Sequence, residues 1–161
     1  MGLLSKKKTP NPEELYNACK TNNRAEVTRL IDAKCDPQAH ADPFTGDVCL
    51  HVCANKNRYE LMETLLKAGA DADKQNKVTG PCVPSSRRLA SSVPSGTLTV
   101  ALGAQLGQTA LHCAAGYGAK ESVALLLAHG AKMVADVEGQ TPLDLATNYR
   151  QAEVVEMLSP T

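Results

Sequence analysis

The feature of this sequence that most restricts its fold is that it repeats itself. The segments G-D-V-C-L-H-V-C-A from Gly46, G-Q-T-A-L-H-C-A-A from Gly107 and G-Q-T-P-L-D-L-A-T from Gly139 are versions of one pattern. The last two begin 32 residues apart, and the first two begin 61 apart, which is one period of 33 plus 28. A period of this length indicates an architecture in which similar units stack side by side.

Each copy is followed by a second and more apolar segment. These segments are E-L-M-E-T-L-L-K-A-G-A-D from Glu60, E-S-V-A-L-L-L-A-H-G-A-K from Glu121 and E-V-V-E-M-L from Glu153, with a weaker copy from Ala25. Their apolar residues recur at helical spacing, so each unit is predicted to be two short helices joined by a turn. One unit cannot bury its apolar face alone, so neighbouring units must share a continuous core.

The turns carry residues that tolerate a positive φ. Asn22, Asn57 and Gly118 fall between the two helices of the first three units. Gly69 and Gly130 follow the second helices, where a left-handed residue commonly ends a helix.

The pattern resembles the ankyrin repeat. The motifs that carry the resemblance are T-A-L-H at 109–112, T-P-L-D at 141–144 and L-L-K-A-G-A-D at 65–71. The resemblance covers roughly residues 12–77 and 106–158. It implies an all-α solenoid of four helix-turn-helix units joined by β-hairpin-like loops, with the first and last units as caps.

The outer units depart from the family pattern in ways that fit capping. Unit one has Glu13 and Glu14 in place of the Thr-Pro pair and Tyr16 in place of the family's His, and unit four has Arg150 at its turn.

The chain of 161 residues fits one folded domain, which we expect over 12–158. Its parts are a disordered basic tail (1–11), units one and two (12–77), an inserted loop (78–105), and units three and four (106–161).

The insertion contains three Pro, five Ser and no acidic residue, which is typical of a flexible loop. Three interpretations remain open: a surface loop without function, a regulatory loop phosphorylated at Ser91, three residues after Arg88, or a retained in-frame intron or gene-model artefact.

The composition and the motifs argue against several function classes. Lys and Arg number 17 and Asp and Glu number 17, which excludes a strongly basic nucleic-acid binder. On a helix His51 points about 200° away from Cys49, so Cys49, His51 and Cys53 do not predict a zinc site. The resemblance implies instead that His51 and His112 hydrogen-bond the backbone of neighbouring hairpins. No catalytic motif stands out, so we expect a chain that is not an enzyme and has no cofactor or metal.

The N-terminus suggests an alternative function. Gly2 is placed for acylation and is followed by three lysines, so the chain could be a membrane-associated regulatory protein that phosphorylation of the inserted loop switches. The favoured hypothesis is a solvated tail. No apolar stretch approaches the roughly 18 residues of a membrane span and no signal peptide is evident. We therefore expect a cytoplasmic chain, with the nucleus as a second location.

The resemblance implies a concave binding face made of hairpin tips and the exposed ends of the first helices. The helix ends are Lys20, Thr21, Asn55, Lys56, Gly116, Tyr117, Asn148 and Tyr149, and the hairpin tips are Phe44, Thr45, Asp47, Glu138 and Gln140. Exposed aromatic residues often anchor protein interfaces. We therefore expect a monomer that binds a protein partner here, as an adaptor, scaffold or inhibitor. The alternative is that the tyrosines only cover the ends of their own units.

Overall fold

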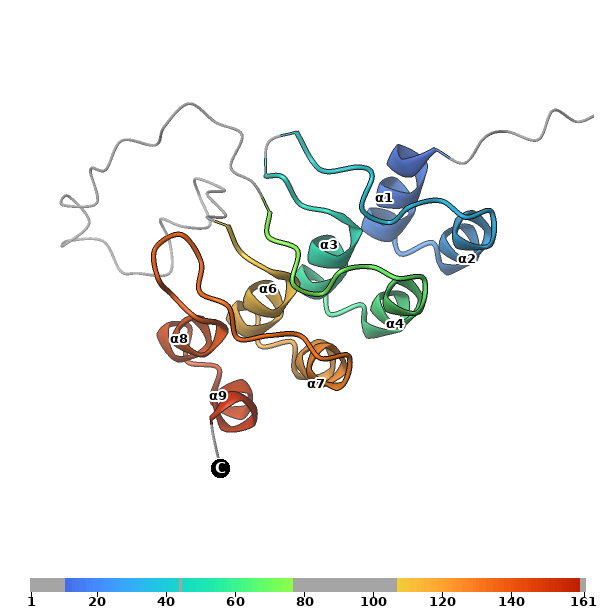
Figure 1. The fold of residues 1–161 in the computed structure, drawn as a ribbon. Coiled ribbons are helices and arrows are strands. Elements are labelled where there is room, and N and C mark those ends of the chain that lie inside the picture. The colour runs from blue at the N-terminus through green and yellow to red at the C-terminus, as the bar shows by residue number, and fades with distance from the viewer. Residues whose placement is uncertain (1–10, 44, 77–106, 160–161) are drawn as a thin grey trace, which may run out of the picture.

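The computed structural model describes residues 11–43, 45–76 and 107–159, and this part of the chain is helical (Figure 1). Its helices are α1 (Pro12–Thr21), α2 (Arg24–Asp32), α3 (Cys49–Asn55), α4 (Tyr59–Lys67), α6 (Ala110–Gly116), α7 (Lys120–Ala128), α8 (Pro142–Asn148) and α9 (Ala152–Leu158). None of these helices is both long and apolar enough to cross a membrane.

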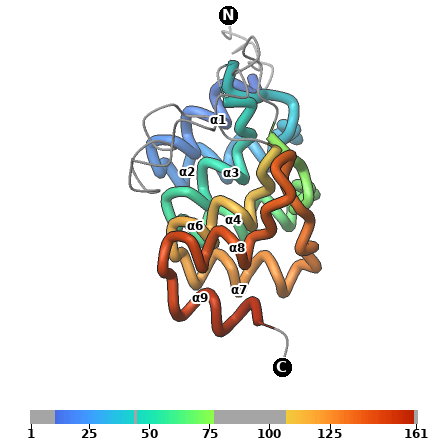
Figure 2. Tube along the Cα trace, turned by 90° about the vertical axis from the view of Figure 1, so that its left-hand side faces the viewer, coloured from blue at the N-terminus to red at the C-terminus, as the bar shows by residue number. Residues whose placement is uncertain are grey.

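The helices form two rows, one for each helix of the unit. The first helices α1, α3, α6 and α8 pack on one another in that order, and the second helices α2, α4, α7 and α9 form the other row. Figure 2 shows the units following one another from the N-terminal to the C-terminal end of the stack. This arrangement confirms the predicted all-α solenoid.

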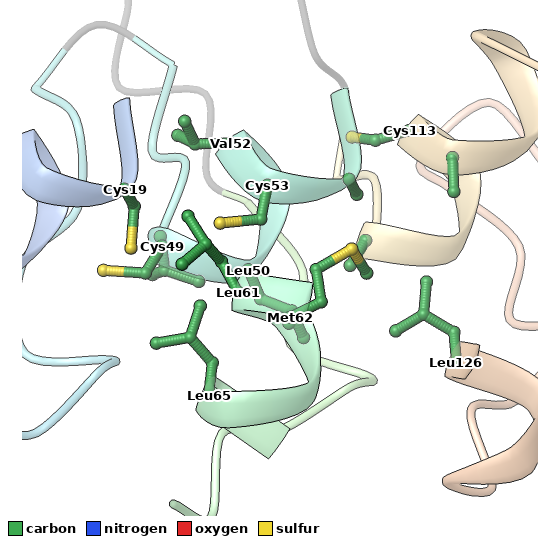
Figure 3. Packing of buried hydrophobic residues seen from close by; sticks show 14 of the residues in the cluster. Cys19, Cys49, Leu50, Val52, Cys53, Leu61, Met62, Leu65, Cys113 and Leu126 are labelled. Atoms are coloured by element: carbon green, nitrogen blue, oxygen red, sulfur yellow. The ribbon is translucent and has the colours of Figure 1, made fainter. Parts of the chain in front are cut away.

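The core runs through the whole stack between the two rows. Leu50 and Leu111 of the first helices and Met62 and Leu126 of the second helices are at most 1% exposed (Figure 3). Ala114 is fully buried, and residues this small let neighbouring helices approach closely.

The predicted turn residues adopt the predicted conformation. Left-handed φ angles occur at Asn22 (60°), Asn57 (49°) and Gly118 (68°) between the helices, and at Gly69 (90°) and Gly130 (80°) after the second helices. The fourth unit uses Arg150 (58°), and Lys34 (60°) takes the place of a glycine after α2. The last two are side-chain-bearing residues in a region that favours glycine.

The loops between units are closed by equivalent backbone hydrogen bonds. The N–H of Asp42 donates to the carbonyl of Asp47 at 2.9 Å, and that of Asp136 donates to Gln140 at 2.8 Å. Between units two and three the bond runs from Asn76 to Gln108 at 2.9 Å. Residues 1–10 of the predicted tail (1–11) and the insertion over 78–105 lie outside the described residues, as do Phe44, Gly2 and Ser91, while Asn11 is the N-cap of α1.

Candidate partner-binding face

The signature histidines join each unit to the next hairpin. The backbone N–H of Val48 donates to His51 Nδ1 at 3.4 Å, and His51 Nε2 lies 2.9 Å from the carbonyl oxygen of Gln108. Because Nδ1 accepts a hydrogen bond, Nε2 carries the proton and donates to that carbonyl.

His112 repeats the arrangement one unit later. Its Nδ1 accepts from the Thr109 N–H at 3.1 Å, and its Nε2 lies 3.0 Å from the carbonyl oxygen of Gln140. Burial lowers the pKa of both histidines, so both are neutral at physiological pH. The family resemblance implied these hydrogen bonds from the histidines to the hairpin backbone. They hold each hairpin against the helix of the preceding unit.

The cysteines nearest His51 are also core residues. Cys49 and Cys53 lie with Cys19 in the packed layer between α1 and α3, while His51 turns to Gln108 (Figure 3). A hydrogen bond with the Cys19 thiol and burial raise the pKa of Cys49, so that this thiol stays protonated. In the described part of the chain, no group of three or more His, Cys, Asp or Glu side chains is arranged to hold a metal ion.

The predicted helix-end and hairpin-tip residues differ in how exposed their side chains are to solvent. Lys20, Thr21, Lys56, Tyr117 and Asn148 are exposed, and Asn55, Tyr149, Glu138 and Gln140 are half-buried. Tyr117 is 60% exposed and is the main aromatic surface among these residues. Asn55 turns its Oδ1 inward, where no donor among the described residues reaches it. The exposed part of the face is therefore narrower than the sequence suggested.

Asp47 does not lie on the exposed hairpin tip where we expected it. It is 5% exposed, and its Oδ1 accepts a hydrogen bond from Asn76 Nδ2 at 2.9 Å. The Oδ1 of Asn76 in turn accepts from the N–H of Gln108 at 2.7 Å, and Asn76 is itself 2% exposed. Burial raises the pKa of Asp47. Asp47 and Asn76 thus form a polar link between two hairpins. The Asp47 side chain is buried in this link and is not available to a partner.

Asn76 was not among the residues predicted for the face. The only available signal is its place in the repeat, because it stands where Asp42 and Asp136 close the other hairpins. Each of these residues donates its backbone N–H across the hairpin and carries a short polar side chain.

The two tyrosines at equivalent helix ends have different surroundings. A Cβ atom added to Gly116 would lie 3.7 Å from Cδ2 of Tyr149, so the Tyr149 ring covers the end of the preceding unit. Gln151 reaches the same place and donates to the carbonyl of Gly116 at 3.4 Å. Partial burial, then the neighbouring Cys113 and Tyr149, raise the pKa of Tyr117, which therefore keeps its phenolic proton at neutral pH. Tyr117 is available to a partner, while Tyr149 is partly a packing residue.

The sequence is similar to known proteins over most of its length. A family model for ankyrin repeats (3 copies) matches residues 90–160, and a model for a single ankyrin repeat matches residues 45–77. The chain is 30% identical over 146 residues to Inversin of Gallus gallus, covering 90% of this chain and 11% of that protein. It is also 30% identical over 154 residues to the tyrosine-protein kinase HTK16 of Hydra vulgaris, covering 88% of this chain and 20% of the kinase. The chain thus spans only a small share of either relative.

Proposed function

Since this chain belongs to the ankyrin repeat family, whose repeats are protein–protein interaction modules, we propose that it is a non-catalytic adaptor, scaffold or inhibitor. It holds a protein partner on its concave face, at the ends of α1, α3, α6 and α8. The observation that carries this proposal is the exposed Tyr117 ring, which caps the C-terminal end of α6, a helix whose N-terminal end is held to the next hairpin by the His112 hydrogen bonds. A preorganised face lowers the ordering cost of binding, and an exposed tyrosine is a frequent anchor.

The test is affinity purification of the whole chain from its native cells, followed by quantitative mass spectrometry. The Tyr117→Ala chain should recover its partner at least about tenfold less well, since truncating an anchor costs about 1.4 kcal/mol or more. Met157→Ala is the control because Met157 is 39% exposed on α9, in the other row of helices. Equal loss in both variants, or no loss in Tyr117→Ala, would place the interface elsewhere.

The alternative, membrane attachment through Gly2 with a switch at Ser91, concerns residues outside the described part of the chain. Intact-mass measurement of the native protein tests it directly, because an acyl group or a phosphate adds a defined mass.

A further inference from the structure

Charged side chains are arranged differently on the two rows of helices. The ion pairs among the described residues are Arg24–Glu60, Arg29–Glu26, Lys67–Glu63, Lys120–Glu153 and Lys132–Asp73, all on second helices or the loops after them. Lys20 and Lys56, at the ends of α1 and α3, are exposed and form no ion pair within the described residues. Lys20 Nζ lies 5.9 Å from the centroid of the Tyr16 ring, so within the described part of the chain neither ammonium group has a carboxylate partner.

Three acidic residues of the hairpins accept hydrogen bonds from other groups of the stack. Asp42 accepts from the hydroxyl of Tyr16 at 3.3 Å, and Asp136 accepts from the N–H groups of Glu138 and Gln140, both at 2.9 Å. Asp47 is buried against Asn76. These carboxylates accept hydrogen bonds within the stack. Glu60, which lines the same cavity as Lys56, is paired with Arg24, so Lys56 has no carboxylate partner among the described residues.

Equivalent positions in successive units set the order of side chains along the face. The residue just before the left-handed turn residue is Thr21, Lys56, Tyr117 and Tyr149 in units one to four, and Lys20 stands one position earlier in unit one. Because Tyr149 lies over Gly116, Tyr117 is the open ring, one unit beyond Lys56. Packed helices lie about 10 Å apart, and an extended chain rises about 3.3 Å per residue, so one unit corresponds to about three partner residues.

We propose that the partner lays an extended acidic-apolar segment across these helix ends, with a carboxylate at Lys56 and an apolar or proline side chain about three residues away at Tyr117. A second carboxylate, about three residues further on the other side, reaches Lys20. This inference rests on the proposed function, since it specifies the chemistry of the segment bound at that face. Opposite charge guides the encounter, and the tyrosine ring supplies apolar contact area.

The experiment selects random 12-residue peptides displayed on phage against the whole chain. Parallel selections use Lys20→Glu/Lys56→Glu, Tyr117→Ala and, as a charge-matched control on the second helices and their loops, Lys67→Glu/Lys132→Glu. The wild type and the control should enrich Asp or Glu three to six residues from Leu, Ile, Phe or Pro. The charge-reversed variant, Lys20→Glu/Lys56→Glu, should enrich peptides that carry Lys or Arg three to six residues from the apolar residue. A selected acidic peptide, synthesised with a fluorescent label, should bind the reversed variant at least about tenfold more weakly by anisotropy.

The two proposals fail in different ways. Peptides that keep their acidic residues on the reversed variant but are lost on Tyr117→Ala would overturn this inference and leave the proposed face standing. Peptides indifferent to both changes, or no enrichment at all, would overturn both. Urea unfolding of each variant shows that the fold is retained, so that a loss of binding reports the surface.

Discussion

The backbone N–H of Asn76 donates to the carbonyl oxygen of Gln108 at 2.9 Å, although the two residues stand 32 positions apart in the chain. Asp136 and Gln140 make the same bond in the next hairpin only four positions apart. The Asn76 side chain adds bonds to Asp47 and to the N–H of Gln108. The stack thus closes its second hairpin in the ordinary way, whatever length of chain lies between the two residues.

Removing residues 78–105 should therefore stabilise the protein. Shortening the closed loop eightfold reduces the entropy lost on closure, so the free energy of unfolding should rise by about 2 kcal/mol. Urea unfolding followed by circular dichroism measures this change. A loss of stability instead would show that the segment packs on the stack.

Asn76→Ala should destabilise the protein by about 2–3 kcal/mol. The change leaves the buried Asp47 carboxyl and the Gln108 N–H without their side-chain partner, and unsatisfied buried groups are costly. Asn148→Ala, at an exposed helix end, is the matched control and should change stability by less than about 0.5 kcal/mol. Equal effects of the two changes in urea unfolding would contradict the role assigned to Asn76.

Stability should fall as the pH is lowered from 7.5 to 5.5. Burial lowers the pKa of His51 and His112 below the ordinary 6.5, so near this pH the unfolded chain binds more protons than the folded chain. The histidine contribution is complete above about pH 7 and is lost as the pH falls through about 6.5 toward the folded pKa of each histidine. The raised pKa of Asp47 acts in the opposite sense, because the folded chain then binds that proton more readily than the unfolded chain.

Urea midpoints at the two pH values measure this dependence, and His112→Gln should remove about half of it. A stability that does not change between these pH values would mean that the histidines are not held neutral by the fold.

Arg150→Gly should stabilise the protein by about 0.5–1 kcal/mol. Arg150 has a φ of 58°, which costs a side-chain-bearing residue more than it costs glycine, and Gly118 occupies the same turn one unit earlier. At the equivalent turn, Gly118→Ala should destabilise the protein, because a Cβ atom there would meet the side chain of Gln151. Thermal unfolding should move by a few degrees in opposite directions for the two variants.

Tyr149→Ala and Tyr117→Ala should differ in their effect on stability. Tyr149 packs over Gly116, so its truncation should lower the free energy of unfolding by about 1–2 kcal/mol. Tyr117 is 60% exposed, and its truncation should cost less than about 0.5 kcal/mol. Chemical denaturation of the two variants side by side tests this. The reverse order would exchange the roles assigned to the two rings.

Local chemistry made much of this fold predictable. The helical spacing of the leucines gave the helices, and Asn22, Asn57 and Gly118 gave the turns because few residues tolerate a left-handed conformation. The roles of His51 and His112 followed from the family resemblance.

What the sequence left open depends on contacts between loops. Whether Asp47 faces solvent or Asn76 is decided by how two hairpins meet, and both outcomes suit a polar residue. Tyr149 likewise contacts Gly116 of the preceding unit. Glycine has no side chain that could have indicated this contact. Neither arrangement has a local sequence pattern.

Asp144 changes what the final unit offers to anything beside it. Its Oδ2 accepts hydrogen bonds from the N–H and the hydroxyl of Thr141, at 2.8 and 2.7 Å, and the hydroxyl bond and then the backbone bond lower its pKa. Where His51 and His112 extend a donor to the next carbonyl, a carboxylate has only acceptors. A group docking at Asp144 therefore meets a hydrogen-bond acceptor, whereas the first helices of units two and three present the donors of His51 and His112 to the next hairpin.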